Sequence, residues 1–111
     1  MTLNEYQELA QRTSNRALDR QGHLINGVLG LAGEAGECAD LVKKCYFQDA
    51  RPIDDDLIDE LGDVLWYVAE TAAARGVTLE QVAVRNVEKL RERYPGGFEA
   101  ERSLHREGVR A

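Results

Sequence analysis

Apolar residues recur at the helical period along most of this 111-residue chain, and this pattern constrains the fold more than any other feature. Between Leu57 and Ala72 they share one narrow arc at 3.6 residues per turn. Similar arcs lie on residues 24–42 and 79–94, and no segment alternates as a half-buried strand does. The sequence therefore predicts an all-α fold.

Breaks in this periodicity divide the chain. Four helical segments are predicted, at about residues 3–20, 24–47, 53–75 and 79–94. Thr2 and Glu5 form a capping box for the first helix, and Asp54, Asp55 and Asp56 are expected to supply the N-cap and first-turn charge of the third. We expect residues 1–98 to form one domain and residues 99–111 a charged C-terminal arm, with at most a short helical turn.

Composition excludes several classes of protein. The net charge of -6 argues against a nucleic-acid partner, although bound cations would still let an acidic site accept a nucleotide. No apolar run is long enough for a membrane helix, and the N-terminus lacks signal-peptide regions. Cys38 and Cys45 lie about 10 Å apart along one helix, so we expect free thiols and a cytoplasmic protein.

Four carboxylates form the most informative pattern. Glu34 and Glu37 lie three residues apart, as do Glu60 and Asp63, so each pair shares a helix face. A hairpin of two antiparallel helices would bring the pairs together, and their repulsion would then favour a hard divalent cation, above all Mg²⁺. Gly27 and Gly30 on the same side point to a close helix or ligand, because glycine destabilises a helix interior. Spacing alone leaves solvated acidic faces as the alternative.

The fourth segment carries a second group of polar residues. Asn86 falls within the apolar arc, where a buried amide needs partners, and Lys89 and Arg93 lie beside it. Lysine and arginine there could bind a polyphosphate. The alternative, which the residues alone favour, is that Asn86 caps or bridges helices. The two cations would then pair with Glu88, Glu92 or solvent.

Three segments carrying these residues resemble the MazG-like nucleotide pyrophosphohydrolases. They are GLAGEAGE at residues 30–37, DELGDVLWY at 59–67 and NVEKLRERYP at 86–95. The resemblance extends from about Leu24 to Phe98. It implies a four-helix antiparallel bundle of the all-α NTP pyrophosphatase type, completed by assembly into a homo-oligomer (a dimer or tetramer).

The resemblance also implies a reaction and a site. The expected reaction is hydrolysis of a nucleoside triphosphate, canonical or modified, to the monophosphate and pyrophosphate. Glu34, Glu37, Glu60 and Asp63 would bind Mg²⁺, with Mn²⁺ as a substitute. Glu37 or Glu34 could instead hold the attacking water as a general base, and the two roles stay open. Tyr67, Asn86, Lys89 and Arg93 would contact the substrate.

Two other functions compete with this one. A ferritin-like di-metal oxidoreductase would need Glu-x-x-His motifs, which this chain lacks. A non-catalytic helical interaction module, or a weakly active family member, is the main alternative. In this family the base pocket involves the variable first helix and partner subunits. Candidates for this pocket are Gln7, Arg16, His23 and Trp66. For each of them, a surface or packing role is the favoured interpretation.

Overall fold

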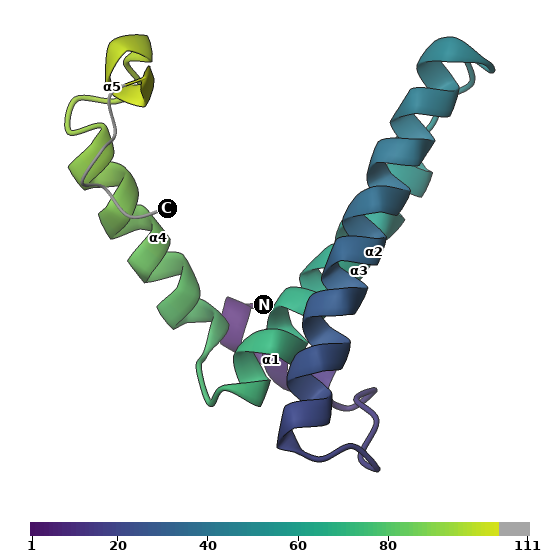
Figure 1. Cartoon of the computed structure of the whole chain (residues 1–111), viewed down its shortest axis with the longest axis vertical. Coiled ribbons are helices and arrows are strands. Elements are labelled where there is room, and N and C mark those ends of the chain that lie inside the picture. The colour runs from purple at the N-terminus through teal and green to yellow at the C-terminus, as the bar shows by residue number, and fades with distance from the viewer. Residues whose placement is uncertain (105–111) are drawn as a thin grey trace. The chain divides into compact units, whose positions relative to one another are not determined.

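The computed structural model of the chain describes residues 1–104, which contain helices and no β-strand (Figure 1). The elements are α1 (Leu3–Gln11), α2 (Arg20–Phe47), α3 (Asp54–Ala74), α4 (Leu79–Arg93) and α5 (Ala100–Leu104). They divide into two compact units, of which the first comprises Met1–Leu79 and the second begins at Glu80. The all-α class is thereby confirmed.

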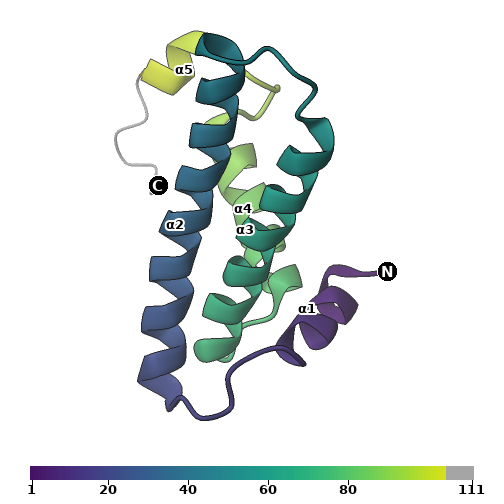
Figure 2. The same cartoon turned by 90° about the vertical axis from the view of Figure 1, so that its right-hand side faces the viewer.

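A long hairpin dominates the first unit. Helices α2 and α3 run side by side in opposite directions, and α1 packs on α3 (Figure 2). Glycines set the distance between α2 and α3: a Cβ at Gly27 would lie 2.4 Å from Thr71 Oγ1, and one at Gly30 would lie 2.1 Å from Tyr67 Cε1. At Gly33 and Gly36, no described atom outside the local backbone of α2 and the adjacent residues lies within 4 Å of the equivalent position. The expected close helix is confirmed, at Gly27 and Gly30.

Helix α1 ends earlier than the predicted boundary near Arg20. Its capping box at Thr2 and Glu5 is present, but the helix stops at Gln11. In the next segment, side-chain oxygens accept hydrogen bonds from backbone amides. Asn15 Oδ1 accepts from Ala17 N, and Asp19 Oδ1, at the N-cap of α2, accepts from Gly22 N. Such local bonds compete with a continuing helix, so α2 begins at Arg20 instead of Leu24.

Helix α3 differs from the prediction at its start. Its N-cap is Ile53, which makes no side-chain capping bond, so the expected aspartate cap is wrong. Asp54, Asp55 and Asp56 occupy the first turn, where their charge favours the helix dipole. The end is as expected: Gly76 has φ +70°, and the Gly76 and Val77 amides donate back to Ala73 and Ala72.

The core of the first unit is small. It consists of Ala10, Ala69 and Leu79, with Tyr6, Trp66 and Val68 packed against it. Many apolar side chains of the predicted arcs are exposed instead, among them Val28 on α2 and Leu61 on α3. Cys38 and Cys45 are free thiols, as predicted. Within residues 1–104, no helix is both long and apolar enough to cross a membrane.

The second unit contains α4 from Glu80 onward and the segment that follows it. Pro95 and Gly97 form a turn after Arg93, and the Tyr94 and Phe98 rings pack at 5.4 Å between centroids. Helix α5 supplies the short helical turn expected in the C-terminal arm. The rest of that predicted arm, residues 105–111, lies outside the described residues.

Candidate metal centre

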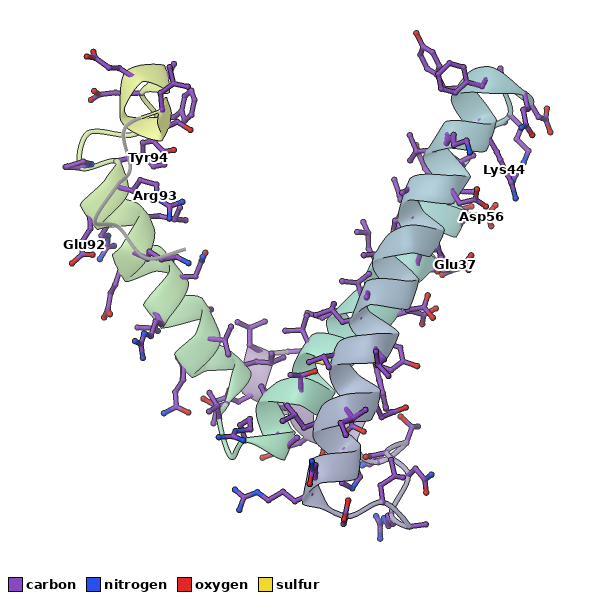
Figure 3. All side chains as sticks on the ribbon, in the orientation of Figure 1. Glu37, Lys44, Asp56, Glu92, Arg93 and Tyr94 are labelled. Atoms are coloured by element: carbon purple, nitrogen blue, oxygen red, sulfur yellow. The ribbon has the colours of Figure 1, made fainter. Side chains whose placement is uncertain are left out.

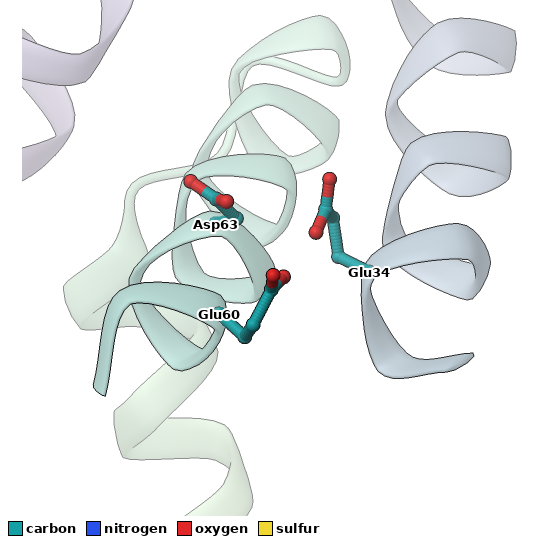
Figure 4. A group of neighbouring side chains, drawn as sticks. All are labelled: Glu34, Glu60 and Asp63. Carbon is teal, nitrogen blue, oxygen red and sulfur yellow. The ribbon is translucent and has the colours of Figure 1, made fainter. Parts of the chain in front are cut away.

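Three of the four predicted carboxylates converge between α2 and α3 (Figure 4). Glu34 projects from α2 toward Glu60 and Asp63 on α3, and one oxygen from each lies within 4.8 Å of the others. The three-residue spacing puts both α3 carboxylates on the side that faces α2. Glu34 and Glu60 are half-buried, whereas Asp63 is exposed. We refer to these three residues as the acidic centre.

Glu60 is the residue of the acidic centre whose charged form is disfavoured by its surroundings. Its pKa is raised above the ordinary value of 4.5, chiefly by hydrogen bonding with the Glu34 carboxyl. Burial and the negative charges of Glu34, Asp63 and Asp59 raise it further. In addition, Glu60 Oε2 is buried and has no hydrogen-bond partner among residues 1–104. An unsatisfied buried oxygen amid like charges fits a divalent cation, which all-oxygen donor sets prefer.

Glu37 stands apart from the acidic centre. It lies one turn beyond Glu34 on α2, is exposed, and appears with Lys44 on the part of α2 that leads to the hairpin connection (Figure 3). The described geometry does not include it in the group of three. Its role as a ligand or base therefore stays a prediction.

Beside the acidic centre is an open hollow of about 310 Å³, lined by Glu34, Asp63, Trp66 and Tyr67. Tyr67, a predicted substrate-binding residue, packs its half-buried ring against α2 at Gly30. The Trp66 and Tyr67 rings meet edge to face, at 4.9 Å between centroids and 83° between planes. The hollow thus combines carboxylates with aromatic walls.

The other predicted substrate contacts lie on α4, in the second unit. Asn86 is exposed, so the expectation of a buried amide is wrong: its apolar neighbours Val82, Val87 and Leu90 are exposed as well. Lys89 and Arg93 are half-buried. The roles of all three toward a polyphosphate remain predictions.

Glu70 is a buried residue that the sequence did not single out. It is 1% exposed, and it accepts hydrogen bonds from Gln11 Nε2 and Ser14 Oγ, each at 2.9 Å. His23 Nδ1 lies 3.3 Å from its Oε2. The available signal was spacing, because Glu60, Asp63, Tyr67 and Glu70 follow one face of α3. These contacts tie α1, the 12–19 connection and α2 to α3.

Gln7 and His23, two of the four candidates for a base pocket, make structural contacts. Gln7 is buried, donates to Ala69 O and Val77 O, and accepts from Leu79 N. His23 contacts Glu70. The packing role expected for these two residues is confirmed.

The fold and site define an all-α protein with a carboxylate centre suited to a divalent cation. Residues 21–98 match the MazG nucleotide pyrophosphohydrolase domain. The chain belongs to the MazG nucleotide pyrophosphohydrolase family, as its sequence predicted. This family generally hydrolyses the pyrophosphate bonds of nucleoside triphosphates and typically depends on a divalent metal.

One relative adds to this assignment. The Gene 37 protein of Mycobacterium phage L5 is 47% identical over 73 residues, which cover 62% of this chain and 64% of the relative. The matched part thus spans less than two thirds of that protein. No solved structure matched the chain.

Proposed function

We propose that this protein hydrolyses a nucleoside triphosphate between the α and β phosphates, releasing the monophosphate and pyrophosphate in a Mg²⁺-dependent reaction. Such an activity would serve the removal of damaged nucleotides or the control of a nucleotide pool. The observation that supports it most is the acidic centre, where Glu34, Glu60 and Asp63 converge and one Glu60 oxygen is buried without a hydrogen-bond partner among the described residues. The centre lies within the segment that matches the family.

The donor chemistry favours Mg²⁺, with Mn²⁺ as a substitute. Glu34, Glu60 and Asp63 would hold the ion, and Glu37 would join them by turning toward α3 or would act from one turn away. When bound, Mg²⁺ would neutralise phosphate oxygens and favour deprotonation of the attacking water.

The remaining proposed roles belong to protein side chains. Glu37 or Glu34 would accept the proton of the water as a general base. Tyr67 would line the substrate site, and Asn86, Lys89 and Arg93 would make the nucleotide contacts that the family resemblance implies. Lys89 would act as a point charge on phosphate, whereas Arg93 would offer a bidentate fork.

Pyrophosphate release tests the reaction directly. The purified full chain is incubated with Mg²⁺ and a panel of canonical and modified nucleoside triphosphates. We expect release with at least one of them, loss of release in EDTA, and a fall of at least about 100-fold in Glu60→Gln. Asp59→Asn is the matched control, because it removes an adjacent charge outside the acidic centre. Failure of every triphosphate would defeat the proposal.

A non-catalytic interaction module is the second candidate, and it makes a different prediction. It needs no metal, so replacing the carboxylates by amides should leave Mg²⁺ affinity unchanged. Isothermal titration with Mg²⁺ separates the two functions. Weaker binding in Glu60→Gln or Asp63→Asn, with a distinctly smaller change in Asp59→Asn, would exclude the module.

We also propose that the protein is a homo-oligomer, either a dimer or a tetramer. The support is the exposure of apolar side chains at helical spacing on α3, where Ile58, Leu61 and Leu65 are 64%, 53% and 38% exposed. A second copy could cover such a stripe. Light scattering coupled to size exclusion should give a dimer or tetramer mass, and Leu61→Glu should lower it. A monomeric wild-type chain would contradict the assembly but leave the reaction open.

A further inference from the structure

Trp66 is the largest side chain that borders the hollow beside the acidic centre. It lies on α3 three residues after Asp63, a rise of about 4.5 Å along the helix. The hollow therefore has two chemical sides: the carboxylates Glu34 and Asp63, and the aromatic rings of Trp66 and Tyr67. When a cation is bound to the carboxylates, a ligand that fits both sides carries an anionic group close to a flat, weakly polar group.

The Trp66 ring is held in a fixed orientation. Its Nε1–H donates to Ala10 O at 3.1 Å and to Thr13 Oγ1 at 2.8 Å. Thr13 is itself fixed, because its hydroxyl donates to Ala10 O at 2.9 Å. Part of the indole packs on the core formed by Ala10, Ala69 and Leu79, and it is only half-buried. A rigid aromatic surface thus borders the hollow at little cost in side-chain freedom.

Tyr67 is less free to serve the same purpose. Its ring occupies the gap at Gly30 and supports the edge of the Trp66 ring. Removing Tyr67 would therefore disturb the contact between α2 and α3. Trp66 borders the hollow while its indole N–H keeps its hydrogen bond to Ala10 O on α1.

We propose that Trp66 forms the wall on which the base of the nucleotide stacks, and that Thr13 is the positioning residue that holds its indole. This inference rests on the proposed function, which puts the phosphates at the acidic centre. In a nucleotide only the sugar separates the α phosphate from the base, so the base must bind close to the carboxylates. Trp66 meets that condition.

The hydrogen bonding of Trp66 also limits what it can recognise. Its N–H already donates to two acceptors of the protein, so it has no donor to offer to a base edge. Stacking is tolerant of base identity, because every base has a π face. Trp66 should therefore supply affinity for any base, and other groups must supply the choice between bases.

Intrinsic fluorescence tests the contact in the unaltered protein, because Trp66 is the single tryptophan of the chain. The probes are α,β-methylene nucleoside triphosphates, which resist cleavage between these phosphates, and inorganic tripolyphosphate, which lacks a base. Both are titrated with Mg²⁺ present, and calorimetry measures binding in parallel. We expect the nucleotides to quench Trp66 emission and tripolyphosphate to leave it largely unchanged.

Variants then test the energetic contribution. Loss of one stacked base corresponds to a fall in affinity of about 5- to 150-fold. In Trp66→Leu we expect a fall of this size for the methylene nucleotides, similar for purines and pyrimidines, and at least fivefold larger than the fall for tripolyphosphate. Trp66→Phe should recover part of the loss. Thr13→Val should change the emission anisotropy of Trp66 and weaken nucleotide binding less than Trp66→Leu does.

The outcomes separate this inference from the function on which it rests. If nucleotides bind by calorimetry but leave the emission unchanged, or quench it no more than tripolyphosphate, the stacking wall is wrong and the hydrolase proposal survives. If no nucleotide binds while pyrophosphate release also fails, both are wrong. An equal loss for tripolyphosphate and nucleotides in a folded Trp66→Leu would also overturn the wall.

Discussion

The contrast between Gly30 and Gly33 offers a direct test of how α2 and α3 approach each other. Both glycines lie in the interior of α2, one turn apart. Replacing either by alanine should stabilise the helix itself by about 0.5–1 kcal/mol, because alanine loses less backbone entropy on folding. At Gly33, no atom of another element in residues 1–104 lies within 4 Å of the new Cβ, so Gly33→Ala should show this gain in full.

At Gly30 the same change meets the Tyr67 ring. The new Cβ would lie 2.1 Å from Cε1 and 2.4 Å from Cδ1, so the ring would have to retreat by more than about 1 Å to reach ordinary contact. Overpacking of this kind typically costs about 1–3 kcal/mol. The intrinsic helix gain is common to both variants. The difference in stability between Gly30→Ala and Gly33→Ala therefore measures the packing cost alone.

Urea denaturation of the two variants measures that difference. With a slope of about 1–3 kcal/mol/M, a cost of about 2 kcal/mol separates the two midpoints by roughly 1 M, with Gly33→Ala the more stable. The penalty should vanish when Gly30→Ala is made in Tyr67→Ala, since the ring that causes it is gone. Equal midpoints for the two alanine variants would refute the close approach of α3 at Gly30.

Three carboxylates should affect, in turn, stability, its pH dependence and catalysis. Glu70→Ala should destabilise the protein by about 2–4 kcal/mol, because buried donors lose their acceptor; thermal unfolding against the exposed-site control Glu8→Ala checks this. The pKa of Glu60 is raised in the folded protein, so in EDTA the free energy of unfolding should fall as pH rises from 4.5 through that folded-state pKa. Urea midpoints should show this fall in the wild type but not in Glu60→Gln. If Glu37 is the general base, Glu37→Gln should lower kcat by about 10²- to 10⁴-fold. It should weaken Mg²⁺ binding less than Glu34→Gln does, because Glu37 lies outside the acidic centre. Equal weakening of Mg²⁺ binding, measured by titration calorimetry, would make Glu37 a ligand.

Local periodicity explains why α2 and α3 were predictable. Their pattern spans many turns, and the end of α3 is set by Gly76, whose positive φ suits glycine. The acidic centre was predictable for the same reason, because i, i+3 spacing fixes which carboxylates share a face. Helix spacing could not predict that Glu34, and not Glu37, joins Glu60 and Asp63, because this depends on where α3 lies.

Tertiary contacts explain what the sequence did not reveal. Glu70 is one of many acids in the chain, and its position on the face of Glu60 and Asp63 does not show that it is buried. Hydrogen bonds from Gln11 and Ser14, more than 50 residues away, give it its structural role. The exposure of Asn86 likewise depends on what covers α4. Periodicity located its arc but could not show whether that arc is buried.

The early end of α1 links the largest error in helix prediction to the proposed base wall. Had α1 continued to Arg20, the Ala10 carbonyl would accept from the amide four residues on and remain within the helix. Instead it accepts from the Thr13 amide at 3.1 Å, from the Thr13 hydroxyl and from the Trp66 indole. Ser14 of the 12–19 connection also donates a hydrogen bond to Glu70, which lies one turn beyond Trp66 on α3. Substitutions in this connection should therefore alter the hold on Trp66, and with it nucleotide affinity, without touching a carboxylate of the acidic centre.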